Sequence, residues 1–209
     1  MGLINNRRSV MNLLSDPLDV YCHRVRFVMA EKGVSVEIID IDPNDKPHEL
    51  LQYNPYNSLP TLVDRDLIIF DTQIMCEYLD ERFPHPPLMP VYPVMRAEAR
   101  CLLLRIERDL YSLYNAILEN HTERSALARE RLVEAFISMA PAFAEKAFFL
   151  SDEFSLLDCS LAPLLWRLPT IGINLPVQAN AVLQYAEKIF ARNAFQASLS
   201  EAEYELRNE

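Results

Sequence analysis

Hydrophobic and polar residues follow two different patterns along the chain, with strand-like runs near its beginning and helical spacing afterwards. The apolar run at residues 10–14 predicts a first strand. From Asp19, apolar residues every three to four positions predict a helix that ends at Gly33. Residues 36–41 predict a second strand, apolar enough to be buried on both faces. Together these segments indicate a βαβ unit with parallel strands.

The next segment predicts a β-hairpin and a helix. Residues 47–52 form a short helix at best. Two apolar runs, ending at Val63 and starting at Leu67, are joined by three polar residues, which is typical of a hairpin. Asp71 or Thr72 can cap the helix that follows. A βαβ unit followed by a ββα unit in about 80 residues is the thioredoxin-like plan.

Helical spacing dominates the remainder of the chain. It predicts long helices over residues 96–119 and 124–144, and further helices near Ser155, over residues 177–192 and close to the C-terminus. Residues 84–93 contain five prolines, which restrict φ and lack an N–H donor, so a stiff linker or surface loop is expected. The predicted division has three parts: a thioredoxin-like domain (1–84), a Pro-rich linker (85–95) and an all-helical domain (96–209).

Composition excludes two classes of function. The chain of 209 residues contains three glycines, too few for a glycine-rich loop that cradles phosphate groups. Its formal net charge of −10 argues against direct nucleic-acid binding, which depends on clustered Lys and Arg. We therefore expect neither a P-loop nucleotide enzyme nor a protein that binds DNA or RNA directly.

The spacing of the cysteines and the hydropathy of the chain indicate in which cellular compartment the protein is expected. The four cysteines are widely separated, with no CxxC and no metal-ligand spacing to histidine, which favours a reducing environment without disulfides. No signal peptide is recognised at the N-terminus. The longest stretch without charges, residues 168–186, contains two prolines and is no candidate for a membrane span. We expect a soluble, cytoplasmic protein with no metal site and no membrane partner.

Two segments resemble proteins of the glutathione transferase fold. Residues 54–63 are similar to an Asn-Pro-x-x-x-Leu-Pro-Thr-Leu segment in which the proline, Pro60 here, is cis. Ser155 and Asp158 resemble the capping box of that fold's helical domain, and the two side chains can each accept a hydrogen bond from the other residue's backbone N–H. The resemblance implies a thioredoxin-like N-terminal domain followed by an all-helical C-terminal domain.

A narrower resemblance, to the stringent starvation protein A family, covers nearly the whole chain. Its most specific part is the run Pro-His-Pro-Pro-Leu-Met-Pro-Val-Tyr-Pro at residues 84–93. This run lies within a longer matching segment, residues 77–94, and the other matching segments are residues 8–11, 30–35, 62–65, 150–156, 163–169 and 195–199. The resemblance implies a bacterial homodimer that associates with RNA polymerase holoenzyme to alter transcription under stress, without glutathione transferase activity.

The thiol-activating position of the transferase fold falls on Asp19 in this chain. A carboxylate there would repel a glutathione thiolate and raise its pKa, the opposite of what catalysis requires. Ser15, Tyr21 and Cys22 are nearby substitutes, although Tyr21 and Cys22 also belong to the helical apolar stripe and favour packing. We therefore expect no enzyme activity, with a glutathione-dependent transferase using Cys22 or Tyr21 as the alternative.

The peptide-binding half of the transferase site is better preserved. A cis Pro60 would expose the Leu59 backbone to a cysteinyl group, although Pro60 also shapes a turn that the fold needs. Asp71 and Thr72 occupy the positions of the Glu-Ser pair that grips the γ-glutamyl carboxylate in the family. These four residues form a candidate vestigial ligand pocket, which leaves a ligand sensor as a further alternative; we expect no cofactor and no glutathione binding.

The Pro-rich segment is the sharper candidate for a binding surface. Its prolines lose little conformational entropy on binding, and His85, Leu88, Met89 and Tyr92 supply polar and apolar contacts. The opposing interpretation is a simple linker in which Leu88 and Met89 seal the domain junction. With the family resemblance added, we expect partner contact through Pro84, His85, Pro86 and Tyr92, with the sigma subunit of RNA polymerase as the partner.

Overall fold

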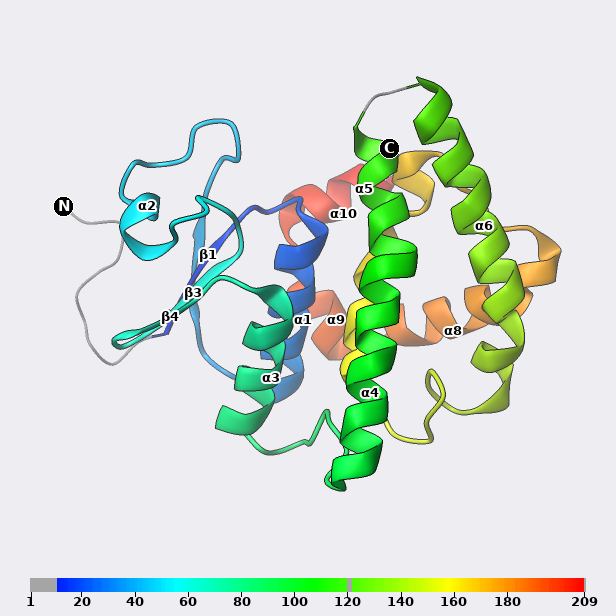
Figure 1. Cartoon of the computed structure of the whole chain (residues 1–209), viewed down its shortest axis with the longest axis horizontal. Coiled ribbons are helices and arrows are strands. Elements are labelled where there is room, and N and C mark those ends of the chain that lie inside the picture. The colour runs from blue at the N-terminus through cyan, green and yellow to red at the C-terminus, as the bar shows by residue number, and fades with distance from the viewer. Residues whose placement is uncertain (1–10, 120–121, 209) are drawn as a thin grey trace. The chain divides into compact units, whose positions relative to one another are not determined.

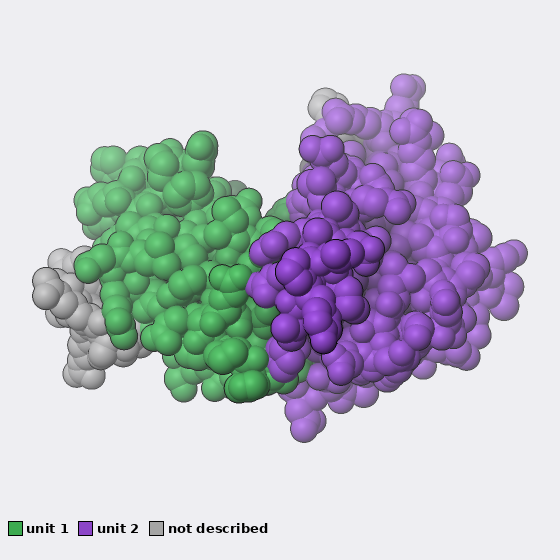
Figure 2. All heavy atoms as spheres, turned by 60° about the horizontal axis from the view of Figure 1, so that its bottom comes forward, with its two compact units in different colours: residues 1–86, 197–209 green, residues 87–196 purple. Residues whose placement is uncertain are grey.

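The structure is a computed structural model that describes residues 11–119 and 122–208. It divides into two compact units: unit 1 comprises residues 1–86 and 197–209, and unit 2 comprises residues 87–196. Figure 2 shows unit 1 in green and unit 2 in purple. The chain divides after Pro86 rather than into the three expected parts, and its C-terminal residues belong with the N-terminal unit.

Unit 1 is built on a four-stranded mixed sheet with the strand order β2-β1-β3-β4. The strands are β1 (Asn12–Ser15), β2 (Glu37–Asp40), β3 (Thr61–Asp64) and β4 (Leu67–Ile69). β1 and β2 are parallel, whereas β3 is antiparallel to both β1 and β4. The predicted βαβ unit and the predicted hairpin are therefore confirmed.

Helices cover both faces of this sheet. They are α1 (Val20–Lys32), α2 (Leu50–Tyr53) and α3 (Thr72–Arg82). α1 and α3 pack against each other on one face (Figure 1). On the other face, Leu50 of α2 forms a buried cluster with Leu14 and Ile41. Gly33 ends α1 with φ of 60°, the left-handed conformation that the sequence predicts for it.

The expectation that residues 36–41 are buried on both faces is wrong. β2 lies at an edge of the sheet, and Ile38 keeps 47% of its surface exposed. Ile39 points the other way and packs against the cluster around Leu14. An apolar run identifies a strand, but strand order decides how much of it is covered, because an edge strand has a neighbour on one side only.

The C-terminal segment contains α9 (Asn193–Ser198) and α10 (Glu201–Asn208). Ser200 and Glu203 cap α10 reciprocally: Ser200 N–H donates to the Glu203 carboxylate at 2.9 Å, and Glu203 N–H donates to Ser200 Oγ at 3.1 Å. Arg26 of α1 forms a buried ion pair with Glu203 at 2.7 Å. These bonds join α10 to α1 within unit 1, whereas residues 193–196 at the start of α9 still belong to unit 2.

Unit 2 is helical over its described residues, as the sequence predicts, with one isolated β-bridge between Phe148 and Ser151. Its helices are α4 (Pro93–Arg105), the π-helical η1 (Ile106–Tyr111), α5 (Ser112–Leu118), α6 (Thr122–Glu145), α7 (Leu156–Arg167), the 3-10 turns η2 (Pro169–Ile171) and η3 (Val177–Ala179), and α8 (Asn180–Phe190). The single helix expected over residues 96–119 is thus interrupted by a π-helical segment, where Tyr111 OH donates to the Ser160 carbonyl at 2.8 Å.

Helix α7 is the centre of unit 2, and all of its residues are buried. The predicted capping box at its start is present: Ser155 N–H donates to the Asp158 carboxylate at 2.8 Å, and Ser155 Oγ accepts from Leu157 N–H. Asp158 also accepts from Phe149 N–H at 3.0 Å and from Tyr185 OH at 2.6 Å. A capping box usually has Glu or Gln at this position. Here the shorter Asp158 both caps α7 and binds the segments that contain Phe149 and Tyr185.

Candidate functional site

The sheet of unit 1 brings the candidate chemical residues to one of its ends. Antiparallel pairing of β1 with β3, and of β3 with β4, aligns the end of β1 with the start of β3 and the end of β4. Ser15, Pro60 and Asp71 therefore lie at the same end of the sheet, beside the loop that leads into α1. Residues far apart in the sequence meet at the place where a thiol ligand would have to be held.

Asp19 occupies this end of the sheet as the N-cap of α1. Its Oδ1 accepts a hydrogen bond of 2.7 Å from Cys22 N–H, and its backbone has the extended conformation typical of an N-cap. The carboxylate thereby satisfies a helix N–H that has no partner within the helix. The side chain at the predicted thiol-activating position therefore stabilises a helix and offers no proton donor for a thiolate.

Two of the three nearby substitutes, Cys22 and Ser15, are buried and already hydrogen-bonded. Cys22 is fully buried, and its Sγ accepts from Asp16 N–H at 3.3 Å. Burial raises the pKa of this thiol well above its usual value, and the Asp19 carboxylate raises it further. Ser15 is also buried, and its Oγ accepts from Arg26 at 2.8 Å. Tyr21 lies half-buried on α1. The interior here favours the neutral thiol over the thiolate.

The candidate ligand pocket keeps part of its expected geometry. The Leu59–Pro60 peptide bond is cis and Pro60 is buried, while Leu59 packs against the cluster around Leu14. Asp71 is exposed and caps α3 by accepting from Ile74 N–H at 2.9 Å, so that Thr72 becomes the first residue of that helix. The sequence allowed either Asp71 or Thr72 as the N-cap of α3, and the structure has Asp71.

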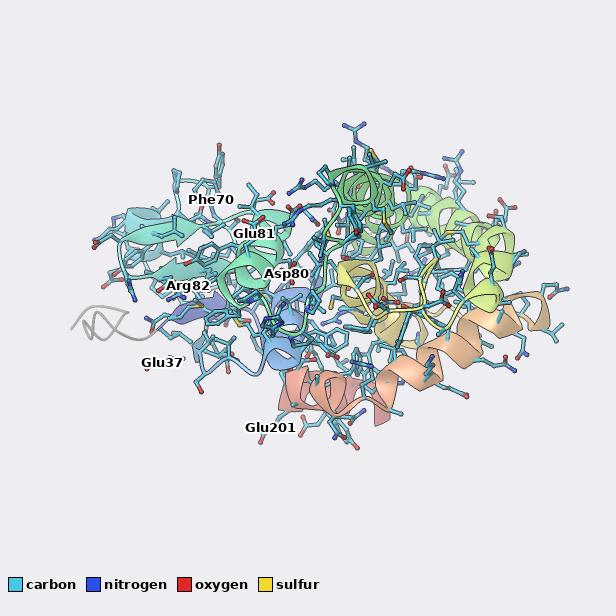
Figure 3. The ribbon with its side chains drawn as sticks, turned by 90° about the horizontal axis from the view of Figure 1, so that it is seen from below. Glu37, Phe70, Asp80, Glu81, Arg82 and Glu201 are labelled. Carbon is cyan, nitrogen blue, oxygen red and sulfur yellow. The ribbon has the colours of Figure 1, made fainter. Side chains whose placement is uncertain are left out.

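The Pro84–Pro86 segment, which follows α3, is anchored by a buried side chain of unit 1. Lys32, in the last turn of α1, forms a buried ion pair of 2.6 Å with Asp80 near the end of α3. The same Lys32 ammonium donates to the Pro86 carbonyl. Figure 3 labels Asp80 together with Glu81 and Arg82 in the last turn of α3. The ion pair thus joins the ends of two helices to the segment that follows α3.

The side chains of that segment face solvent. Pro84, His85 and Pro86 are all exposed, and the His85–Pro86 bond is cis. Sequence reasoning singled out these three residues but missed Lys32 and Asp80. A signal was present: Asp80 follows the buried Cys76 by four positions, and Lys32 follows the buried Val28 by four, so both lie on apolar helix faces. Opposite charges on two such faces indicate a buried pair.

Residues 88–92, in unit 2, divide into buried and exposed positions. Tyr92 is 71% exposed and precedes the first residue of α4. Leu88 and Met89 are buried, and the Leu88 carbonyl accepts from Leu156 N–H at 2.9 Å. Of the two alternatives for Leu88 and Met89, burial rules out the contact set and favours a packing role. Their side chains fill an interior because the backbone at Leu88 is bonded to the start of α7.

Each unit also exposes apolar residues together. On α4 of unit 2, the exposed residues spaced three to four apart are Val94, Ala97, Cys101 and Leu104. In unit 1, Tyr56 is 73% exposed and its ring lies 5.3 Å from that of Phe70, which Figure 3 labels. Contiguous exposed apolar residues typically mark protein–protein contacts.

Of the described histidines, His48 and His85 are exposed, and His121 lies outside the described residues. His23 is buried, and its Nε2 lies 3.0 Å from Ser198 Oγ. Within residues 11–119 and 122–208, no three His, Cys, Asp or Glu side chains gather as they would around a metal ion. In the same residues, no helix combines the length and the apolar character that crossing a membrane requires.

Two domain families of known proteins match parts of the chain. A glutathione S-transferase N-terminal domain family matches residues 14–87, and a glutathione S-transferase C-terminal domain family matches residues 115–188. A rice glutathione S-transferase, solved in complex with glutathione, superimposes with a TM-score of 0.82 at 22% identity, covering 95% of each chain. This likeness shows the glutathione transferase fold.

Two curated relatives are more similar in sequence. A stringent starvation protein A homolog from Coxiella burnetii is 50% identical over 202 residues, which are 96% of this chain and 97% of that protein. A stringent starvation protein A homolog from Pasteurella multocida is 48% identical over 195 residues, 93% of this chain and 92% of that protein. With this identity over nearly its whole length, the chain belongs to the stringent starvation protein A family and has the glutathione transferase fold.

Proposed function

We propose that the protein regulates transcription by binding RNA polymerase holoenzyme through Pro84, His85, Pro86 and Tyr92, and that it does so without catalysis. The observation that carries the proposal is the Lys32–Asp80 ion pair, which holds the Pro86 carbonyl while the side chains of the segment stay exposed. Membership of the stringent starvation protein A family supports the polymerase as the partner.

The segment has physical properties suited to protein recognition. Proline restricts the unbound backbone, so less conformational entropy is lost when the segment binds. The buried anchor restricts it further, because the Pro86 carbonyl already has a donor. His85 adds a polar ring between two apolar ones. Such a preordered surface gives affinity without a large contact area.

Charge favours a protein partner with a basic surface. The net charge of −10 steers the protein toward positive potential on the polymerase and opposes direct contact with the phosphate backbone of DNA. The sigma subunit is the proposed contact. On this proposal the protein acts at promoters through the polymerase, in the cytoplasm and without a membrane partner.

The active species is proposed to be a homodimer. Two exposed apolar surfaces support this: the stripe Val94, Ala97, Cys101 and Leu104 on α4, and the Tyr56–Phe70 pair of unit 1. Both remove apolar area from water when a second copy covers them. A dimer also presents two copies of the Pro84–Pro86 segment, which raises its effective concentration at the polymerase.

A pull-down of purified RNA polymerase holoenzyme tests the proposal. Replacing Pro84, His85 and Pro86 with Ala should reduce capture by more than about tenfold, because recognition surfaces concentrate their binding energy in few residues. A variant with Pro43, His48 and Pro55 replaced by Ala is the matched control, since it loses the same residue types from exposed positions. Light scattering should show both variants as dimers; undiminished capture by the first variant would overturn the proposed surface.

One observation favours a second candidate function, a glutathione-dependent enzyme or a glutathione sensor. Pro60 and Asp71 lie at the same end of the sheet, where the resemblance to the glutathione transferase fold implies a glutathione site. Calorimetry with glutathione tests for a sensor. Conjugation of glutathione to an electrophile, lost on Cys22→Ser or Tyr21→Phe, would establish the enzyme; the buried thiol of Cys22 leads us to expect no conjugation.

A further inference from the structure

Unit 1 contains a groove that none of the functions above uses. It has a volume of about 730 Å³ and is lined by the second half of α1, the outer strand β2 and the C-terminal segment around α9 and α10. Sites that bind ligands typically enclose about 300–1,000 Å³. Neither Asp19 nor the Pro84–Pro86 segment lines the groove.

The wall formed by the C-terminal segment is held in place by buried polar contacts. Arg26 donates to Glu203 at 2.7 Å and to the Ser198 carbonyl at 3.0 Å. Ser200 Oγ donates to the Pro17 carbonyl at 2.6 Å. Because these bonds join α10 to α1 and to the loop before it, the groove is formed without a ligand. A preformed site loses little entropy on binding.

The floor of the groove is apolar and partly uncovered. Met29 and Ala30 of α1 contribute to it, together with Val36 and Ile38 from the β2 side. Val36 and Ile38 are two positions apart, so both point to the same face of the sheet. Ile38 leaves 47% of its surface exposed there. An apolar side chain placed on this floor would remove that area from water.

The backbone of β2 offers unused hydrogen-bonding groups next to this floor. Glu37 N–H donates to Met11 and Ile41 N–H donates to Ser15, both in the direction of β1. Because these groups alternate along a strand, the N–H and C=O groups of Ile38 and Asp40 point outward from the sheet edge. Within the described sheet β2 has β1 as its single neighbour. An outward edge of this kind can pair with an extended peptide.

Acidic side chains surround the groove. Asp40, Glu201 and Glu205 line it and are exposed, and Figure 3 labels Glu201 at the start of α10. The one basic side chain in the lining, Arg26, is already paired with Glu203. The unneutralised charge at the rim is therefore negative, which favours a cationic occupant.

We propose that this groove binds an extended, basic segment of a partner protein. The segment pairs with the outer edge of β2, places an apolar side chain on the floor formed by Met29, Val36 and Ile38, and directs Lys or Arg toward Asp40, Glu201 and Glu205. Strand pairing supplies affinity, while the floor and the acidic rim select the sequence. This second contact is independent of the Pro84–Pro86 surface and is not required by the proposed function.

Binding of labelled peptides to the full chain tests the proposal by fluorescence anisotropy. The probes are seven-residue peptides in which Lys or Arg alternates with Val, Ile or Leu, and the controls carry Glu in place of each basic residue. The basic peptides should bind, and the acidic ones should not. Methylating the alternate backbone nitrogens that face β2 should abolish binding, whereas methylating the other set should not. Absence of binding by every basic peptide up to millimolar concentration overturns the proposal.

Variants of the chain locate the site. Asp40→Asn, Glu201→Gln and Glu205→Gln combined should weaken binding about tenfold or more at low salt. The matched control, Asp66→Asn, Glu130→Gln and Glu134→Gln combined, removes the same charges from exposed positions elsewhere and should leave the affinity unchanged.

A floor variant and a competitor complete the test. Ile38→Asp should abolish binding, with an unchanged melting temperature as the sign that its exposed side chain is not needed for folding. Unchanged affinity in either groove variant overturns the proposal. Spermine that binds as tightly as the peptides and displaces them would also overturn it, in favour of a small-cation site.

Discussion

Helix α1 has a charged side chain at each of its ends, Asp19 and Lys32, and the two charges bind different partners. At the first end, the Asp19 carboxylate accepts from the backbone N–H of Cys22, three residues later, and caps the helix. At the other end, the Lys32 ammonium is buried, pairs with Asp80 of another helix and donates to the Pro86 carbonyl. One charge completes a helix, and the other positions a distant exposed segment.

The difference shows how one fold can serve either chemistry or recognition. Chemistry at the first end would need a polar group free to stabilise a thiolate, and there Asp19 is engaged as a cap while Cys22 is buried. Recognition at the other end needs a fixed backbone beneath exposed side chains, and the Lys32–Asp80 pair supplies that anchor. Substitutions at Lys32, Cys76 and Asp19 test this contrast, and their expected effects decrease in that order.

Breaking the ion pair should have the largest effect. Lys32→Met leaves the Asp80 carboxylate buried without its cation, and the free energy of unfolding should fall by about 3–5 kcal/mol. Urea unfolding measures this loss. The double variant Lys32→Met with Asp80→Leu should recover most of it, because an apolar pair needs no compensation.

The double variant also separates stability from function. It no longer donates to the Pro86 carbonyl, so capture of RNA polymerase should stay weak although the protein is folded. A single variant that costs less than about 1 kcal/mol would show that the pair is not an anchor. Full capture of RNA polymerase by the double variant would show that the exposed Pro84–Pro86 segment binds without the Lys32–Asp80 anchor.

The next effect concerns the interior between α1 and α3. Burial raises the pKa of the Cys76 thiol from 9.0 to about 11, although Arg24 acts in the opposite direction. Because the folded-state pKa lies above the unfolded one, the stability that Cys76 contributes is fully present below about pH 9 and is lost as the pH rises toward 11.

Unfolding free energies of the native protein and of Cys76→Ala, measured at several pH values, test this directly. The difference between the two free energies should stay constant below about pH 8.5 and decrease by about 2 kcal/mol by about pH 10.5. The decrease should come from the native protein, whose buried thiol resists ionisation. A difference that does not change with pH would mean that the interior between α1 and α3 tolerates a thiolate, and would contradict the expected effect of burial on the Cys76 thiol.

The smallest effect is expected at the first end of α1. Asp19→Ala removes the N-cap and should lower the free energy of unfolding by about 1 kcal/mol. Asp19→Asn keeps a cap oxygen and serves as the control, with little change expected. Thermal unfolding measures both. Polymerase capture should be normal in each variant, and a large loss of capture in Asp19→Ala would contradict the functional separation of the two ends.

Local patterns in the sequence predict local structure well. Strand-like runs around three polar residues predict the β3–β4 hairpin, Gly33 predicts the end of α1, and Ser155 with Asp158 predicts the start of α7. Each of these features depends on neighbours within a few residues, so periodicity and turn chemistry are sufficient. Residues Ser200 and Glu203 form another such signature, which the sequence reading did not use.

Features that depend on distant neighbours were missed or misjudged. The exposure of Ile38 follows from the position of β2 at the sheet edge, and the burial of Leu88 follows from its bond to the start of α7. The Lys32–Asp80 pair joins residues 48 positions apart. Apolar periodicity cannot show which surfaces meet, because many partners would satisfy the same pattern.

The sequence by itself determined the order of the strands and helices of unit 1, the end of α1 at Gly33, the capping box of α7, the family, and the Pro84–Pro86 segment as the candidate surface. The tertiary structure decided that Lys32 and Asp80 hold that segment and that Cys22 is buried. It also decided that residues between 197 and 205 form one wall of an acidic groove beside β2. The physical reason is that burial and ion pairing are properties of surfaces brought together by folding, whereas caps and turns are properties of adjacent residues.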